Sequence, residues 1–337
     1  MLTLGVLASI AGVAIALAID WFPQSASTQA KKVDSLWDIV LVISVPIFIL
    51  VLVVVLFCVW KFRQRPGEEL KDGPPIHGNT QLEVVWTAIP ALLLVGLCSY
   101  TFFVLDEIEQ KDPDELVVNV TGEQFTWTFA YPSVRAGRKP LASSQLYLPK
   151  DRPIRFNVRT KDVLHDFWVP QFRMKIDAVP GITTQVRVTP DTVGRYPVVC
   201  AELCGVGHAT MRQVAHVVEP GEFQRWVRSR QRPAGGAAAG GGGGQAAADG
   251  RAIFTGAAGC GGCHTLAAAG TSGQTGPKLD QVLKGEDKAF IRESIVNPGA
   301  KIAKGFGPNI MPENFGQTLT PQELNALVDY LSKETQG

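Results

Sequence analysis

Residues 198–211 read "VVCAELCGVGHATM" and gather four soft metal-binding side chains into one short segment. The whole chain of 337 residues has only 6 Cys, 5 His and 4 Met. The four side chains recur at steps of four, four and three: Cys200, Cys204, His208 and Met211. Gly205 and Gly207 argue against a regular helix in this segment, because glycine is a poor helix former. We therefore expect a loop wrapped around a ligand.

A histidine further upstream can join this loop. The stretch "VLHDFWVP" places His165 at the start of an expected strand, where a β-sandwich would bring it to the same point. Two thiolates, two imidazoles and a thioether form a soft ligand set that suits copper. The alternatives for Cys200 and Cys204 are an ordinary disulfide or half of a zinc site. Neither alternative explains the neighbouring His208 and Met211, although a lone methionine more often fills a core.

A second cluster, "CGGCH" at residues 260–264, has a different chemistry. Cys260, Cys263 and His264 form the C-x-x-C-H sequence that attaches a c-type heme, with both thiols bonded to the heme and the histidine bound to its iron. A zinc or redox C-x-x-C is the alternative, but no further ligands lie nearby in the sequence. Met311 is the one methionine after this motif, and a thioether as sixth ligand raises the potential of a heme iron.

Three apolar stretches lie in the first third of the chain. Residues 1–19 are rich in small residues, and we expect a signal peptide within residues 1–30, with a retained N-terminal apolar segment as the alternative. Residues 36–60 carry one charge and residues 84–105 carry none. Each is long enough for a bilayer core that needs about 20 residues, so residues 31–106 are predicted to form a transmembrane hairpin.

The charges of the chain give its orientation. Lys61, Arg63 and Arg65 follow the first predicted helix and Lys71 lies further on, so the positive-inside rule makes this loop cytoplasmic. Everything after residue 106 then lies outside the plasma membrane of a bacterium. The net charge is +1, from 32 basic and 31 acidic residues, and no basic run is interleaved with aromatics. This balance argues against a nucleic-acid partner.

The exported part divides in two. Residues 107–230 contain short alternating runs separated by Pro, Gly and Asp, which predicts a β-sandwich or barrel. Residues 231–248 are a Gly/Ala-rich linker without periodicity. Residues 249–337 turn to helical spacing, with Thr320 as an expected N-cap and Glu323 three residues later.

Residues 33–228 resemble cytochrome c oxidase subunit II of the heme-copper oxidases. The motifs that carry this resemblance are "CAELCGVGHATM", "DVLHDFWVPQFRMKIDAVPG", "GEQFTWTFAYP" and "HGNTQLEVVWTAIP". Residues 247–336 resemble a class I cytochrome c, including Gly276-Pro277 and the terminal "VDYL". Together they imply a two-helix transmembrane hairpin, an all-β cupredoxin-like domain and a small all-α class I cytochrome c domain.

The resemblance also implies the cofactors and their ligands. The implied ligands of a binuclear CuA copper centre are His165, Cys200, Cys204, His208 and Met211 by their side chains and Glu202 by its backbone carbonyl. The Glu202 side chain would be free for a magnesium site shared with subunit I. The implied heme c is bonded covalently to Cys260 and Cys263, with His264 and Met311 as axial ligands of its iron.

The function implied by the resemblance is electron transfer. Electrons would pass from the fused heme c to CuA and on to the heme-copper subunit I, which reduces oxygen to water coupled to proton pumping. The implied partners are subunit I, subunit III, the lipid bilayer and an upstream donor, either a soluble cytochrome c or a respiratory complex. The rival interpretations are a CuA-bearing nitric oxide reductase subunit, and a membrane-tethered electron carrier or copper-delivery protein.

Two expectations concern single residues. The family usually shows two tryptophans separated by one residue where electrons enter, and this chain has Phe125 and Trp127 there, so docking of a soluble donor is altered. Glu83 precedes the second membrane helix, where the resemblance implies the entrance of a proton pathway. The alternative for Glu83 is an interfacial charge that anchors the helix. We further expect the linker to hold the cytochrome near copper by tethering alone.

Overall fold

The computed structural model describes residues 2–67, 75, 77–132, 140–231, 249–308 and 310–336. It divides into two compact units, Met1–Pro23 with Lys31–Gln110, and Gln24–Ala30 with Lys111–Gly337. The predicted linker at 232–248 and Lys71 of the predicted cytoplasmic loop lie outside the described residues.

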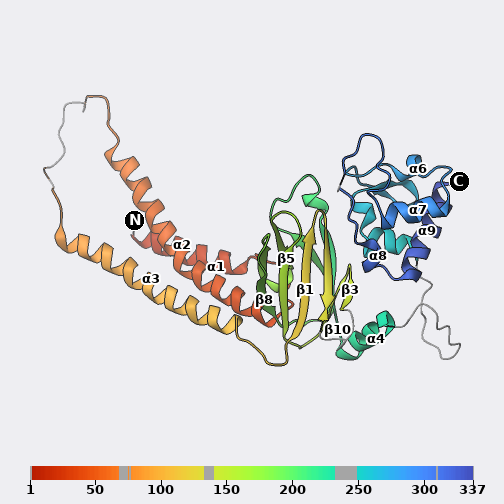
Figure 1. The fold of residues 1–337 in the computed structure, drawn as a ribbon. Coiled ribbons are helices and arrows are strands. Elements are labelled where there is room, and N and C mark those ends of the chain that lie inside the picture. Colours follow the sequence, from red (N-terminus) through yellow and green to blue (C-terminus); the bar gives the residue numbers. More distant parts are fainter. Residues whose placement is uncertain are drawn as a thin grey trace. The chain divides into compact units, whose positions relative to one another are not determined.

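The first unit is helical. Its elements are α1 (Leu2–Ala18), most of α2 (Thr28–Phe62) and α3 (Thr80–Ile108). Figure 1 shows α1 lying along α2, and a Cβ added at Gly12 would come within 2.9 Å of Val45, so a small residue permits this approach. An ion pair between Lys32 and Glu107 joins α2 to α3.

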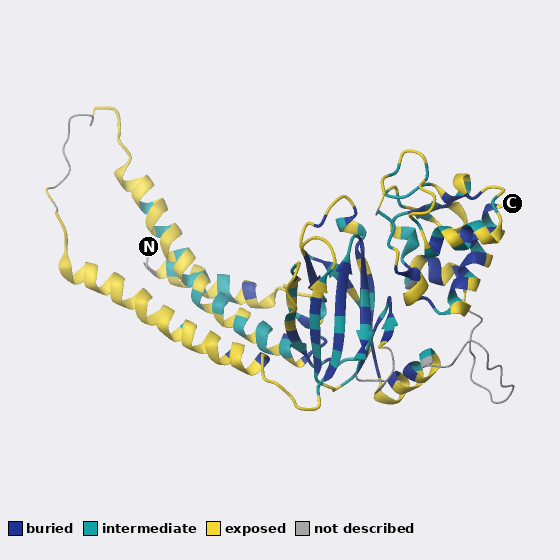
Figure 2. Cartoon of the chain, in the orientation of Figure 1, coloured by how far each residue is buried: buried dark blue, intermediate teal, exposed yellow. Residues whose placement is uncertain are grey.

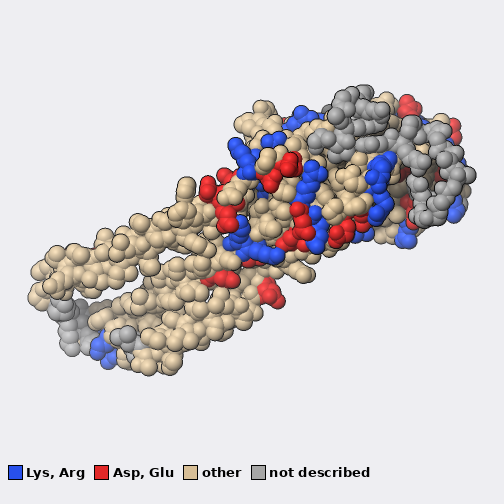
Figure 3. Space-filling model, turned by 90° about the horizontal axis from the view of Figure 1, so that it is seen from below, with Lys and Arg blue, Asp and Glu red and all other residues tan. Residues whose placement is uncertain are grey.

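Both α2 and α3 are long and apolar enough to cross a membrane. Almost none of their residues is buried: α3 is exposed along nearly its whole length and α2 is partly exposed and partly half-buried (Figure 2), which is unlike a core helix of a soluble protein. In the space-filling view the helical part carries almost no charged residues along most of its length (Figure 3). Pro46 lies inside α2 and Pro90 inside α3, which membrane helices tolerate because neighbouring groups satisfy the freed backbone.

Ten strands of the second unit form two five-stranded sheets among the described residues. The first sheet has the order β3 (Leu141–Ser143), β2 (Thr126–Tyr131), β1 (Leu116–Glu123), β5 (Ile154–Thr160) and β8 (Thr184–Val188). The second has the order β4 (Leu146–Pro149), β10 (Arg212–Val218), β9 (Gly194–Cys200), β6 (His165–Trp168) and β7 (Lys175–Ala178). The pairs β1–β5 and β4–β10 are parallel and the others are antiparallel.

The two sheets bury one face each, as the alternation in the sequence predicts. Side chains along β1 alternate between buried and half-buried positions from Leu116 to Val120 (Figure 2). The rings of Trp127, Phe129 and Phe156 all pack against Phe167, with centroids 5.2 to 6.3 Å apart. Helix α4 (Pro220–Gln231) covers one end of this core with Phe223. The sandwich confirms the predicted all-β, cupredoxin-like class.

The C-terminal part is helical around a second core. Its elements are α5 (Gly250–Ala252), α6 (Leu279–Val282), α7 (Lys288–Val296), α8 (Phe315–Thr318) and α9 (Pro321–Thr335), with a short ribbon of β11 (Thr265–Leu266) and β12 (Thr271–Ser272). The predicted start of α9 is confirmed, because Glu323 N donates to Thr320 Oγ1 and Thr320 N donates to Glu323 Oε2. Gly250 lies so close to Tyr330 and Ala326 of α9 that any side chain there would clash.

Candidate functional site

The segment 198–211 is the connection between two neighbouring strands. Strand β9 ends at Cys200, and β10 begins one residue after Met211. The backbone N–H of Cys200 donates to the carbonyl of Met211 at 3.2 Å, so the ladder closes the base of the loop. Strand β6 pairs with the other edge of β9, with Phe167 opposite Cys200. The order β10–β9–β6 therefore brings His165, the first residue of β6, to the same loop.

The predicted ligand atoms converge at this point. The separations are 3.9 Å from Cys200 Sγ to Cys204 Sγ, 3.9 Å from Cys200 Sγ to His165 Nδ1, 3.6 Å from Cys204 Sγ to His208 Nδ1, 3.8 Å from Cys204 Sγ to Met211 Sδ, and 3.1 Å from Cys200 Sγ to Glu202 O. The two sulfurs are too far apart for a disulfide, whose S–S bond is about 2 Å long, and both cysteines are free thiols. The arrangement fits a soft metal centre built on two thiolates.

A carboxylate outside the predicted ligand set orients one imidazole. Asp162 Oδ1 lies 2.8 Å from His165 Nε2, and a carboxylate can only accept, so Nε2 carries the proton. The lone pair of Nδ1 then faces the Cys200 sulfur. Such outer partners fix the ring and the tautomer of metal-binding histidines. Asp162 opens the quoted motif "DVLH", and its spacing from His165 is the signal that could have found it.

The two thiols differ in acidity. Burial opposes ionisation of Cys200, but hydrogen bonds, first among them that with His165, outweigh it and lower its pKa to about 7. Burial, followed by the charge of Cys200, raises the pKa of Cys204 to about 12. One thiolate therefore forms readily at neutral pH, and a bound cation would have to displace the proton of the other.

The two aromatic residues expected near electron transfer lie under the loop. Phe125 is 9% exposed and occupies the space where a Cβ of Gly207 would lie. Gly205 adopts φ +128 above the same ring, a conformation that favours glycine. Trp127 is fully buried, with its ring centroid 5.9 Å from that of His165. Trp127 therefore supports the candidate ligand from inside the sandwich.

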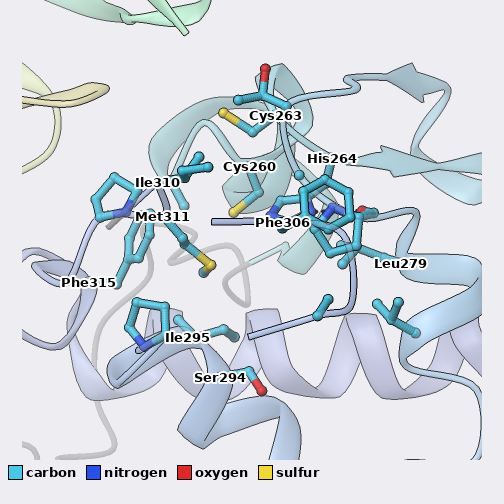
Figure 4. Close-up of a pocket in the computed structure, with 18 of the residues that line it drawn as sticks. Cys260, Cys263, His264, Leu279, Ser294, Ile295, Phe306, Ile310, Met311 and Phe315 are labelled. Carbon is cyan, nitrogen blue, oxygen red and sulfur yellow. Dashed lines mark hydrogen bonds between the residues drawn. The ribbon is translucent and has the colours of Figure 1, made fainter. Parts of the chain in front are cut away.

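The second cluster lines a cavity of about 460 Å³. Figure 4 shows Cys260, His264 and Met311 around this pocket, among apolar side chains that include Leu279, Ile295 and Phe315. Cys260 begins a tight turn (Cys260–Gly262) and Cys263 ends it, with His264 as the next residue. Met311 enters from a separate segment just before α8.

The geometry of His264 suits an iron ligand. Its Nδ1 lies 2.9 Å from the carbonyl of Pro277, which can only accept, so Nε2 keeps its lone pair. Burial lowers the pKa of His264 and keeps the ring neutral, although the Pro277 hydrogen bond opposes the shift. A Cβ added at Gly276 would come within 2.5 Å of the ring, so only glycine admits this packing. A buried apolar cavity with two thiols, an oriented imidazole and a thioether fits a covalently attached heme.

Two further predicted roles concern carboxylates. The side chain of Glu202 is exposed on the loop 198–211, while its backbone carbonyl lies 3.1 Å from Cys200 Sγ in the first cluster. Glu83 lies in the first turn of α3, where its Oε1 accepts from the backbone N–H of Asn79 at 3.1 Å. Asn79 in turn caps the helix by accepting from Leu82 N. The structure thus gives Glu83 a local role at the start of the helix.

Comparison with known proteins matches three parts of the chain to three families. Residues 14–104 match "Cytochrome C oxidase subunit II, transmembrane domain", residues 136–218 match "Cytochrome C oxidase subunit II, periplasmic domain", and residues 247–334 match "Cytochrome c".

Curated relatives carry the same name. Cytochrome c oxidase subunit 2 of Synechocystis sp. is 32% identical over 276 residues, which cover 66% of this chain and 81% of the relative. The protein of that name from Thermostichus vulcanus is 34% identical over 282 residues, which cover 66% and 84%. Among solved structures, the periplasmic domain of subunit II of cytochrome oxidase of Bradyrhizobium japonicum is 31% identical, covers 36% of this chain and 97% of that one, and has a TM-score of 0.33.

Proposed function

We propose, because the chain belongs to the cytochrome c oxidase subunit II family and ends in a cytochrome c domain, that it relays electrons from a fused heme c to CuA and on to subunit I. Subunit I then reduces oxygen to water, coupled to proton pumping. The observation that carries the proposal is the meeting of both thiols of the copper loop with His165, His208 and Met211 in one small cluster.

The residues that would hold the copper are His165, Cys200, Cys204, His208 and Met211, with the carbonyl of Glu202. When bound, a copper centre would supply one-electron exchange, and Cys200 and Cys204 would hold it as thiolates. The protein's part is to keep this site rigid and dry. Asp162 holds the His165 ring, the β9–β10 ladder holds the two ends of the loop, and Phe125 fills the space beneath it.

The residues that would hold the heme are Cys260 and Cys263 by covalent attachment, and His264 and Met311 at the iron. When bound, such a heme supplies one-electron exchange at a potential that the thioether ligand raises. The Pro277 carbonyl orients His264, and the apolar walls of the cavity exclude water.

Several parts of the assembly belong to the same proposal. The exposed Glu202 carboxylate is available to a magnesium ion shared with subunit I. The partners are subunit I, subunit III and an upstream donor. The chain is anchored in the membrane by two apolar helices and has a periplasmic domain. We place it in a bacterial plasma membrane with both electron-transfer domains outside, and with a signal peptide within residues 1–30 or, as the alternative, a retained N-terminal apolar segment there.

To test the proposal, the complex is purified with the unaltered chain and with its Cys204→Ser and Met211→Leu variants. Their metal content, spectra and oxygen uptake are then compared. The unaltered chain should show copper, the spectrum of a c-type heme, a co-eluting subunit I and oxygen uptake. Cys204→Ser should abolish the mixed-valence copper signal while the heme spectrum persists, because the heme ligands lie around a separate core. Met211→Leu should be milder, since a weak thioether ligand tunes the potential of copper more than it holds the metal.

Each rival has its own outcome. Retention of two coppers and the near-infrared CuA band by Cys204→Ser would contradict the ligand assignment. Uptake of nitric oxide in place of oxygen would indicate a nitric oxide reductase subunit. A chain that loads copper and heme but purifies without subunit I would indicate a free electron carrier or copper-delivery protein.

A further inference from the structure

Two part-buried polar contacts join the cytochrome c domain to the copper-binding sandwich within the second unit. Asn314, immediately before α8, donates from Nδ2 to Thr128 Oγ1 of β2 at 2.7 Å. Arg230, at the end of α4, donates from Nη1 to Glu323 Oε2 in the first turn of α9 at 2.8 Å. These contacts join residues 186 and 93 positions apart, so chain continuity does not explain them.

Burial distinguishes these contacts from chance surface encounters. Asn314 is 5% exposed, and the side chains of Arg230 and Glu323 are 11% and 22% exposed. An exposed ion pair contributes little to stability, whereas a buried donor that loses its partner carries a full desolvation cost. Ile310, four residues before Asn314, packs against the apolar core of the sandwich. The interface therefore has an apolar anchor as well as polar pairs.

The same interface aligns the two cofactor-binding segments. Cys263 Sγ lies 3.8 Å from Thr210 Oγ1, and Thr210 immediately precedes Met211 of the copper loop. A Cβ added at Gly262 would lie 3.6 Å from Thr210 Cβ, so the turn of the C-x-x-C-H motif is in van der Waals reach of the loop. Phe125, Thr126 and Arg212 of the sandwich also line the heme cavity. The wall of that cavity is thus completed by the other domain.

We propose that the cytochrome c domain docks on its own copper domain in one orientation, fixed by Asn314–Thr128 and Arg230–Glu323, with Thr210 seated against Cys263. The proposal deepens the electron-relay function and rests on it. It replaces the expectation that the linker holds the two domains together by tethering alone. The docked cytochrome c domain also covers the face of the sandwich that carries Phe125 and Thr210. An external electron donor would therefore bind to the cytochrome c domain and not to the copper loop.

The test cuts the linker of the intact chain. A protease site is inserted within residues 240–244, the purified complex is cleaved, and co-elution of the released C-terminal fragment with the remainder is followed across dilution. We expect the fragments to stay together at micromolar concentration. Thr128→Val and Arg230→Gln should each raise the dissociation constant about fivefold to tenfold, the effect of losing one part-buried polar contact. Lys288→Gln is the matched control, because it breaks an exposed ion pair with Asp329 inside the cytochrome c domain.

A double-mutant cycle tests the pairing itself. Glu323→Gln removes the charge but keeps the helix cap, since glutamine also serves in a capping box. The double variant Arg230→Gln with Glu323→Gln should weaken binding no more than the stronger single variant, which is the signature of direct contact. Dissociation of the unaltered fragments at every concentration, or strictly additive effects, would overturn the proposal. Co-elution measures only binding between the two fragments and depends on neither metal content nor oxygen uptake. Failure of the relay function would therefore show in the oxygen-uptake measurement and not in this one.

Discussion

The four histidines discussed have three kinds of environment, which differ in what the ring nitrogens contact. His165 and His264 each give one nitrogen to an oxygen acceptor, which leaves the other free for a metal. His208 faces Cys204 through Nδ1. His216, in contrast, has a buried Nε2 without a hydrogen-bond partner among the described residues. Its ring stacks on Tyr147 with centroids 4.5 Å apart, so its role is packing.

The environment of His216 makes the stability of the sandwich depend on pH. Burial, with a further contribution from the charge of Arg195, lowers the pKa of His216 to about 4, below the usual value of about 6.5. The unfolded chain therefore binds a proton more readily than the folded chain. The stability contribution of neutral His216 is therefore present above pH 6.5 and is lost as the pH drops from 6.5 toward 4.

Calorimetry of the purified chain at pH 7.5 and pH 5 checks this expectation. His216→Phe keeps a ring to stack on Tyr147 but removes the titrating group, so the sandwich transition of the variant should shift several degrees less between the two pH values. Equal shifts in both proteins would show that His216 does not titrate within this window.

At the start of helix α3, the carboxylate of Glu83 has two candidate roles, helix capping and proton transfer. Glu83 accepts a hydrogen bond from Asn79 N, and the family resemblance gives it a place at the entrance of a proton pathway in subunit I. Glu83→Gln keeps an oxygen acceptor for the cap but loses the proton-binding charge. We therefore expect Glu83→Gln to slow oxygen turnover while the copper and heme spectra stay unchanged.

Glu83→Ala serves as the comparison, because it removes the cap as well as the charge. A lost cap costs about 1 kcal/mol and should lower the yield of folded complex relative to Glu83→Gln. Turnover rates of Glu83→Gln equal to those of the unaltered chain at every pH would leave capping as the sole role of Glu83.

The helices also show what a sequence pattern measures. The apolar run 36–60 predicts only the part of the helix that lipid can surround. Helix α2 itself begins earlier, at Thr28, because the polar residues before the run are also helical. The strands were recognisable by alternation, and the spacing within residues 198–211 indicated that its four soft side chains act together. The position of His165 beside that loop depends on the order β10–β9–β6, which no local pattern encodes.

Contacts between distant segments were the least predictable. The hydrogen bond of Asn314 to Thr128 joins an irregular segment to a strand, and neither residue has a distinctive motif around it. Thr210 lies in the loop that the sequence singles out, but no local sequence pattern places it beside Cys263. That contact depends on how the two cores pack against each other. The sequence therefore predicted which residues would bind cofactors and left open how the two predicted binding segments face each other.

For the whole molecule, the arrangement across the membrane follows from charge and chain order. Lys61, Arg63 and Arg65 follow the apolar part of α2, and transfer of several positive charges across a bilayer is unfavourable. The loop between α2 and α3 should therefore stay in the cytoplasm. Since α3 returns the chain across the membrane, the sandwich and the cytochrome c domain should both lie outside.

One protease can test both sides of this arrangement in a single chain. Cleavage sites are inserted within residues 68–74 of the loop and within residues 240–244 of the linker, and spheroplasts are treated from outside. We expect the linker site to be cut and the loop site to be protected, with the reverse in inverted vesicles. The linker site is the internal control, because its cleavage shows that the protease is active and has access. Cleavage of the loop in sealed spheroplasts would contradict this orientation and would place both predicted cofactor-binding segments in the cytoplasm. The cytoplasm keeps thiols reduced, whereas we expect both segments to lie in an oxidising compartment.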